Sequence, residues 1–204
     1  MSRHSLTSLL DLAGARAGHF RLESGLHSRL WLDLDGLFAD GSRIAPLVRQ
    51  LGETLLPHGV TAVCGPLLGG AFLAQLVARD LGVEFWFTER VADAEPAGLF
   101  PAHYVLPPAL ARRAAGRRVA IVDDVMSAGS ALRATCTEVR IHGADPVVAG
   151  ALLVLGSVGA DWFAAEGVPV EAVLRHHFET WPPGGCPLCA AGVPLEDLTS
   201  SVTR

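Results

Sequence analysis

Residues 118–131 read Arg-Val-Ala-Ile-Val-Asp-Asp-Val-Met-Ser-Ala-Gly-Ser-Ala, and this stretch decides the fold class. The apolar run 118–122 predicts a buried strand, because parallel strands that are covered on both faces carry continuous aliphatic side chains. Residues 123–130 predict a turn of small and polar residues, and the apolar spacing that follows predicts a helix over 131–141. A strand, a short turn and a helix in this order are typical of a parallel α/β sheet.

The same alternation extends in both directions along the chain. Helical spacing precedes or follows most of the apolar runs, and Pro and Gly separate the segments. The predicted strands are 19–22, 30–34, 62–64, 83–88, 118–122, 146–155 and 170–174, and the predicted helices are 5–13, 42–57, 71–80 and 131–141. These elements predict an α/β fold with a central, mostly parallel sheet flanked by helices, a mobile loop over 91–102 and a surface tail from residue 180.

Composition excludes several classes of protein. The chain has 204 residues, half of them hydrophobic, which predicts one domain with a sizeable core rather than a disordered chain. The net charge is −5 and all 16 basic side chains are Arg, so no basic stripe for nucleic acid and no lysine chemistry are expected. No uncharged apolar run approaches the roughly 20 residues that span a bilayer. We therefore expect a cytoplasmic protein with neither a membrane nor a nucleic-acid partner.

The turn after the predicted strand carries the chemistry of a sugar-phosphate site. In an open parallel sheet, ligands bind beyond the carboxyl ends of the strands, where a helix N-terminus offers free N–H groups to phosphate. Ser127 and Ser130 can add hydroxyl donors, and Gly129 lets the backbone approach closely. Asp123 and Asp124 can accept hydrogen bonds from vicinal sugar hydroxyls or assist Mg²⁺. The alternative is a buried strand before an ordinary capped helix, with the two acids as turn residues.

Residues 123–131 resemble the phosphoribosyl pyrophosphate (PRPP) signature of the type I phosphoribosyltransferases. Within that family the chain looks most similar to the orotate enzymes. Residues 18–33 resemble their N-terminal G-x-F-x-L-x-S-G-x-x-S segment, and residues 64–74 resemble their pyrophosphate loop. The ending, residues 179–195, resembles the tail of one bacterial branch. The resemblance covers roughly residues 14–195.

This resemblance implies transfer of 5-phosphoribosyl from PRPP to orotate with release of pyrophosphate, as in pyrimidine biosynthesis. It implies a single domain 1–204 with a hood segment 1–40 and a tail 180–204, Mg²⁺ held mainly through PRPP, and a homodimer. The implied PRPP-binding residues are Leu68, Gly69, Arg90, Asp123, Asp124, Val125, Met126, Ser127, Ala128, Gly129, Ser130 and Ala131. The implied base-binding residues are Trp31, Leu32 and Ser127, and the implied catalytic residues are Arg90 and Asp124.

Cationic positions depart from the family pattern, and this keeps two alternatives open. Glu23 and Gly69 stand where the family often has basic residues, and the loop after Arg90 carries acids. The segment 154–158 lacks the Arg that contacts the orotate carboxylate in the family. Arg90 and His103 are the nearest compensating groups, and Arg29 is a candidate cation for the base. The alternatives are a PRPP-binding regulatory or catalytically impaired homologue, and a phosphoribosyltransferase for a different base.

The four cysteines fall into two pairs with different expectations. Cys64 and Cys136 lie in apolar elements and are interpreted as inert core thiols. Cys186 and Cys189 form one C-x-x-C, with His176 and His177 upstream. A structural zinc site needs four ligands, so a single C-x-x-C is half a site. We interpret the segment as a structural tail, with zinc binding and a redox role as the alternatives, and assign no metal site from the sequence.

Overall fold

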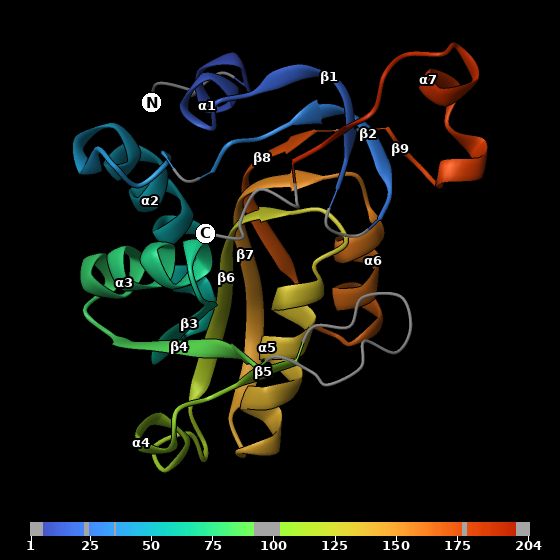
Figure 1. Ribbon diagram of the computed structural model, residues 1–204. Helices are drawn as coiled ribbons and strands as arrows, with labels where there is room; N and C mark the ends of the chain where they lie inside the picture. The colour runs from blue at the N-terminus through green and yellow to red at the C-terminus, as the bar shows by residue number, and fades with distance from the viewer. Residues whose placement is uncertain (1–5, 23–24, 35, 92–102, 177–178, 199–204) are drawn as a thin grey trace. The chain divides into compact units, whose positions relative to one another are not determined.

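The computed structural model describes residues 6–22, 25–34, 36–91, 103–176 and 179–198, and it divides into two compact units. One unit joins Met1–Ala39 with His177–Arg204, and the other is Asp40–His176. The chain segments expected as an N-terminal hood and a C-terminal tail thus belong to one unit, and the sugar-phosphate segment belongs to the other (Figure 1).

The unit Asp40–His176 is built on a six-stranded sheet with the order β5-β4-β3-β6-β7-β8. Five of the strands are parallel, and β5 pairs antiparallel with β4 at one edge. The strands are β3 (Ala62–Pro66), β4 (Glu84–Val91), β5 (His103–Val105), β6 (Arg118–Met126), β7 (Asp145–Leu155) and β8 (Val170–His176). The predicted fold class is confirmed, because long apolar strands such as β7 are buried over most of their length.

Helices cover both faces of this sheet (Figure 1). They are α2 (Gly41–Leu55), α3 (Gly69–Leu81), α4 (Pro108–Ala111), α5 (Ser130–Ile141) and α6 (Val158–Ala165), with a 3₁₀ turn η1 (Leu56–His58) after α2. Asp40 begins α2 by accepting a hydrogen bond from the Ser42 N–H at 2.9 Å. The apolar stripe of α5, which includes Leu132, Cys136 and Val139, joins the core that also contains Ile121 and Trp86.

Several elements of this unit differ from the sequence-based expectation. Strand β6 continues through Met126, so Asp123 and Asp124 lie in the strand and not in a turn. Pairing with β7 explains the difference, since Asp123 and Val125 stay in register with residues of β7. Helix α6 and strand β5 were not predicted, and α3 begins at Gly69 rather than Ala71. Residues 92–102 of the predicted mobile loop lie outside the described residues.

The other unit contains a four-stranded sheet with the order β10-β1-β2-β9. Strands β1 (Arg16–Arg21) and β2 (His27–Trp31) form an antiparallel pair, and the tail adds β9 (Thr180–Trp181) beside β2 and β10 (Glu196–Asp197) beside β1. Helix α1 (Leu6–Leu12), the 3₁₀ turn η2 (Pro183–Gly185) and α7 (Pro187–Ala190) complete the unit. The tail therefore takes part in a sheet, although more than 150 positions of sequence separate it from each of its partner strands. None of the helices in the described part of the chain is long and apolar enough to cross a bilayer.

Candidate active site

The two acids of the signature lie at the carboxyl end of β6, near the middle of the parallel sheet. Strand β3 is paired with β6 on one side and with β4 on the other, and Cys64 lies level with both Ile121 and Trp86. Asp123 and Asp124 extend two and three residues beyond that level. They therefore stand at the edge of the sheet where ligands of open parallel sheets bind.

The loop between β3 and α3 packs directly against these acids. A Cβ atom built on Gly69 would lie 2.1 Å from Oδ2 of Asp124, and one on Gly70 would lie 2.8 Å from Oδ1 of Asp123. A Cβ on Gly65 would lie 2.0 Å from the Gly70 carbonyl oxygen. Each distance is too short for a real side chain, so glycine is required where the loop backbone meets the carboxylates. The Leu67–Leu68 peptide in this loop is cis, and Leu68 is 69% exposed.

Asp124 is nearly buried, with 7% of its surface exposed, while Asp123 is half-buried. The Val125 N–H donates to Oδ1 of Asp124 at 2.7 Å, and the Asp124 N–H donates to Oδ1 of Asp123 at 3.0 Å. Burial raises the pKa of the Asp124 carboxyl above its ordinary value of 3.8, although the bond from Val125 acts in the opposite direction. Both carboxylates are held by backbone donors in a fixed orientation, which suits recognition of two neighbouring hydroxyls.

Residues 127–131 form the turn into α5 beside the acid pair. Gly129 is the N-cap residue with φ 72°, a left-handed conformation that favours glycine, and no side chain caps the helix. The first turn of α5 carries no acidic residue, so its N-terminus remains favourable for an anion. The Ser127 carbonyl accepts the Gly159 N–H at 3.0 Å, and the Met126 side chain is fully buried. The Met126 side chain therefore offers no surface to a ligand.

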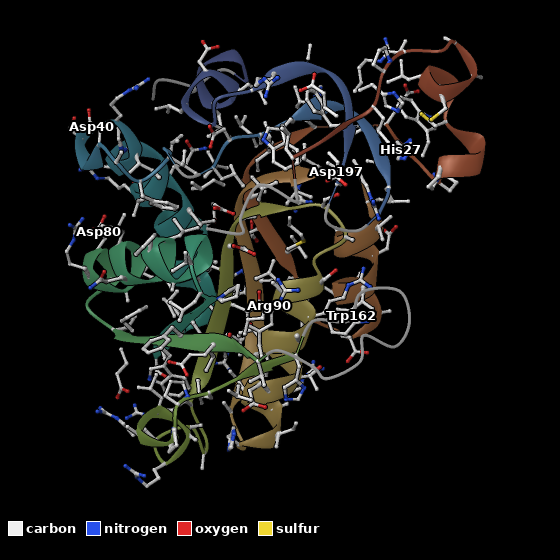
Figure 2. All side chains as sticks on the ribbon, viewed as in Figure 1. His27, Asp40, Asp80, Arg90, Trp162 and Asp197 are labelled. Atoms are coloured by element: carbon white, nitrogen blue, oxygen red, sulfur yellow. The ribbon has the colours of Figure 1, made fainter. Side chains whose placement is uncertain are left out.

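Arg90 lies near the end of β4, at the same edge of the sheet (Figure 2). Residues 86, 88 and 90 share one face of the strand, and the Thr88 hydroxyl on that face bonds to the Thr135 hydroxyl of α5 at 2.7 Å. The Thr88 carbonyl accepts the Leu67 N–H at 2.9 Å, which anchors the start of the glycine-rich loop. Arg90 is exposed, and it pairs through its backbone position with Tyr104 of β5. His103, the other compensating group expected, is the exposed first residue of β5.

Arg133 is a cation at this site that the sequence analysis did not single out. A Cβ on Gly129 would lie 3.9 Å from Nε of Arg133. The Arg133 guanidinium donates to the Val158 carbonyl at 2.9 Å and lies 5.4 Å from the ring centre of Trp162. Its position four residues after Gly129, one turn along the helix, is a signal that could have identified it. The fold thus brings a guanidinium to the start of α6, close after the β7 end where the sequence lacks Arg.

The expected base-binding residues and the two expected core cysteines lie in different parts of the fold. Trp31 and Leu32, the expected base-binding residues, lie at the end of β2 and just after it, in the unit Met1–Ala39 with His177–Arg204, and Trp31 contacts Phe20 with ring centres 6.2 Å apart. Their role in base binding stays a prediction, as does that of the exposed Arg29, and Glu23 lies outside the described residues. Cys64 and Cys136 are fully buried, and burial raises the pKa of both thiols, that of Cys136 to about 11, which fits inert core thiols.

Comparison with known proteins agrees with this geometry. Residues 40–173 match the family model described as a phosphoribosyl transferase domain. The chain is 31% identical over 195 residues to the orotate phosphoribosyltransferase of Desulforamulus reducens, covering 95% of each chain, and 36% identical over 180 residues to that of Carboxydothermus hydrogenoformans, covering 87% of each. The chain belongs to the phosphoribosyltransferase family.

Solved structures show the same fold. The orotate phosphoribosyltransferase of Aeropyrum pernix superposes with a TM-score of 0.64 at 22% identity, covering 84% of this chain and 94% of that one. The adenine phosphoribosyltransferase of Rhodothermus marinus superposes with a TM-score of 0.63 at 22% identity, covering 84% of this chain and 100% of that one. Because the two scores are nearly equal, the fold alone does not distinguish the bases that these enzymes use.

Proposed function

We propose that this protein is an enzyme that transfers the 5-phosphoribosyl group from PRPP to orotate and releases pyrophosphate. The observation that carries the proposal is the contact between the Gly69–Gly70 backbone and the Asp123–Asp124 pair at the carboxyl edge of the sheet. The relatives named orotate phosphoribosyltransferase, similar over nearly the whole chain, support orotate as the base.

Each part of the site suits one part of PRPP. Asp123 and Asp124 are oriented to accept hydrogen bonds from the 2′- and 3′-hydroxyls of the ribose. The turn 127–131 and the start of α5 suit the 5′-phosphate, because they present backbone N–H groups and a favourable helix dipole without a competing carboxylate. The loop 65–70 suits the pyrophosphate, whose departure from the anomeric carbon is favoured by nearby positive charge from Arg90. Holding both reactants in line lowers the entropic part of the barrier.

Mg²⁺ fits the donor chemistry of this edge. The available side-chain donors are carboxylate oxygens, which Mg²⁺ prefers, and the residues assigned to PRPP binding include no imidazole and no sulfur besides the buried thioether of Met126. When bound with PRPP, the ion would supply charge neutralisation for the pyrophosphate. The cytoplasmic location and the homodimer remain predictions from the sequence and its resemblance.

The experiment is incubation of the purified protein with PRPP, Mg²⁺ and orotate while pyrophosphate release is followed. Adenine, hypoxanthine and uracil are matched controls. We expect release with orotate alone. Release with another base and not with orotate would overturn the choice of base while keeping the transferase.

A PRPP-binding protein without catalysis is the second candidate, and the cation content of the site favours it. Gly69 offers no side chain where the family often has a basic one, and Arg90 is followed by the exposed, apolar Val91. Calorimetry with PRPP distinguishes the two candidates. PRPP binding without pyrophosphate release from any base would favour the regulatory function.

A further inference from the structure

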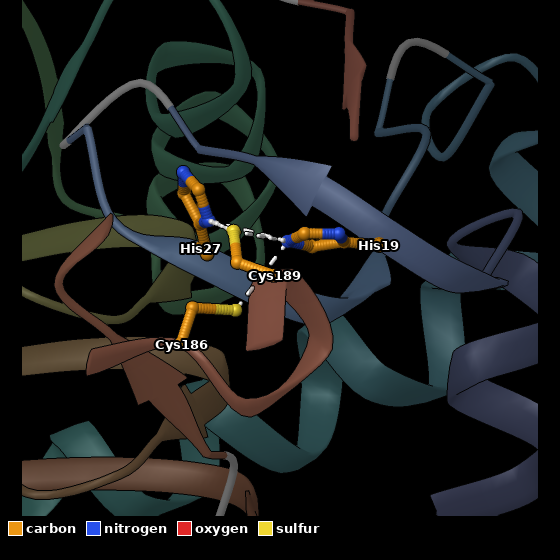
Figure 3. A group of neighbouring side chains, drawn as sticks. All are labelled: His19, His27, Cys186 and Cys189. Carbon is orange, nitrogen blue, oxygen red and sulfur yellow. Dashed lines mark hydrogen bonds between the residues drawn. The ribbon is translucent and has the colours of Figure 1, made fainter. Parts of the chain in front are cut away.

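Four potential metal ligands gather in the unit formed by Met1–Ala39 and His177–Arg204 (Figure 3). They are His19 of β1, His27 of β2, Cys186 and Cys189. Their ligand atoms all lie within 4.8 Å of one another. His19, His27 and Cys186 are buried and Cys189 is exposed. Among the described residues, the C-x-x-C is therefore completed by two histidines more than 150 positions away and not by His176, while His177 lies outside the described residues.

Distances between the ligand atoms match the edges of a metal tetrahedron. With Zn–N near 2.05 Å and Zn–S near 2.3 Å, a regular tetrahedron has edges of about 3.3 Å for N–N, 3.6 Å for N–S and 3.8 Å for S–S. Nε2 of His19 lies 3.2 Å from Nδ1 of His27, 3.4 Å from Sγ of Cys186 and 3.7 Å from Sγ of Cys189. Sγ of Cys189 lies 3.3 Å from Nδ1 of His27. Four of the six distances are therefore close to the edges of such a tetrahedron, and the other two, from Sγ of Cys186 to His27 and to Cys189, are within 4.8 Å.

Hydrogen bonds among these four side chains do not account for the arrangement. The Nδ1–H of His19 donates to the Val193 carbonyl at 2.8 Å, which leaves Nε2 with a single lone pair. That lone pair can accept one proton, yet His27, Cys186 and Cys189 all point a polar atom at it. A cation at the centre would be a partner for all four groups. A carbonyl that holds the second nitrogen of a histidine is also the usual support of a metal-bound imidazole.

We propose that His19, His27, Cys186 and Cys189 form a structural zinc site. Two thiolates and two imidazoles in tetrahedral array suit Zn²⁺, while carboxylate-preferring ions such as Mg²⁺ are disfavoured by this donor set. Four protein ligands leave no open position, so the site has a structural and not a catalytic role. Its ligands come from β1 and β2 and from the tail, so the ion links chain segments that are far apart in sequence.

The strand pairings between the tail and the β1–β2 pair are few and short, which explains why an ion would stabilise this unit. The tail joins the sheet through the two-residue strands β9 and β10. The ion pairs Arg16–Glu196 and Arg21–Asp197 at that junction are exposed, and such pairs contribute little. A metal bond between β2 and the tail closes a loop of well over a hundred residues, and binding free energy of this kind becomes folding free energy.

The first test is metal analysis of the full-length protein purified without chelator. We expect about one zinc per chain, measured by mass spectrometry of the elements. Cys189→Ser, at the exposed ligand, is expected to lower the zinc content at least tenfold, and Cys189→Asp to retain most of it because a carboxylate can replace the thiolate. His142→Gln and Cys136→Ala, which remove the same residue types in the other unit, are expected to keep the zinc.

Cobalt substitution tests the geometry without any mutation. The apoprotein loaded with Co²⁺ is expected to show the intense d–d absorption of a tetrahedral ion together with thiolate-to-cobalt charge transfer. Removal of the metal is expected to increase hydrogen exchange about tenfold or more in β1, β2 and 179–198, compared with the metal-loaded protein.

Three results would overturn the zinc assignment. They are a metal content below about a tenth of an ion per chain, the weak spectrum of octahedral cobalt, and a Cys186–Cys189 disulfide in the freshly purified protein. The disulfide would instead indicate a redox pair. These measurements count metal and thiols, so they are independent of the transferase activity proposed above.

Discussion

Replacing Gly69 by alanine tests the contact on which the proposed active site rests. The new Cβ would lie 2.1 Å from Oδ2 and 3.0 Å from Cγ of Asp124, and real Cβ atoms essentially never come closer than 3.0 Å to another heavy atom. Asp124 cannot turn aside freely, because its other oxygen accepts the Val125 N–H at 2.7 Å. Relief of the clash would break that hydrogen bond to a charged group, which is worth about 1.5–3 kcal/mol. We therefore expect Gly69→Ala to lower the free energy of unfolding by about 2 kcal/mol.

A double-mutant cycle with Asp124→Ala makes this prediction specific. The three atoms nearest to the added Cβ are Oδ2, Cγ and Oδ1 of Asp124. Asp124→Ala deletes all three and so removes the obstacle. In that background Gly69→Ala should cost less than about 0.5 kcal/mol. Urea denaturation of the four proteins measures the coupling. Gly41→Ala is the control, because a Cβ there meets no atom within 4 Å. If Gly69→Ala lowered the free energy of unfolding equally in the wild-type and Asp124→Ala proteins, the reasoning would be refuted.

Four further predictions concern the ligand and the charge of the site. Asp124→Asn should weaken PRPP binding about tenfold, the equivalent of 1.4 kcal/mol for one hydrogen bond that loses its charge; unchanged affinity by calorimetry would contradict the ribose assignment. Arg90→Ala should lower kcat at least tenfold with less effect on PRPP affinity, and a wild-type rate would remove Arg90 from the mechanism. Arg133→Gln should raise the Kd for PRPP or the KM for orotate several-fold, since it removes one cation from the edge of the site. Unchanged values of both would show that Arg133 contributes to packing and not to ligand binding. Because burial raises the pKa of Asp124 in the folded state, the folded protein binds its proton more tightly, and this carboxyl lowers stability as pH rises above about 4. Asp124→Asn should therefore stabilise the protein more at pH 7 than at pH 4. Thermal unfolding of both proteins at the two pH values measures this, and an equal stability difference between mutant and wild type at both would contradict the prediction.

Local patterns in the sequence were sufficient for most of the central unit. The apolar runs of β6 and β7 predicted strands because continuous aliphatic side chains need cover on both faces. The order of Asp123, Asp124, Gly129 and Ser130 predicted the ligand class because neighbouring residues at one strand end share one edge of the sheet. What local patterns missed depends on partners elsewhere. Strand β6 continues through its two acids because β7 supplies the hydrogen bonds, and that pairing has no signal within 123–126.

The sequence by itself determined the parallel α/β class, and it predicted a sugar-phosphate site over 123–131, since each depends on residues close together in the chain. Only the tertiary structure decided which distant groups meet. Gly69 meets Asp124 because β3 and β6 are neighbours in the sheet, and Arg133 reaches Val158 because α5 and α6 both follow strands that end at the same edge. His19 and His27 meet Cys186 and Cys189 because the tail adds strands to both sides of the β1–β2 pair. Sheet register brings such groups together, and register is a property of strand pairs that no single segment carries.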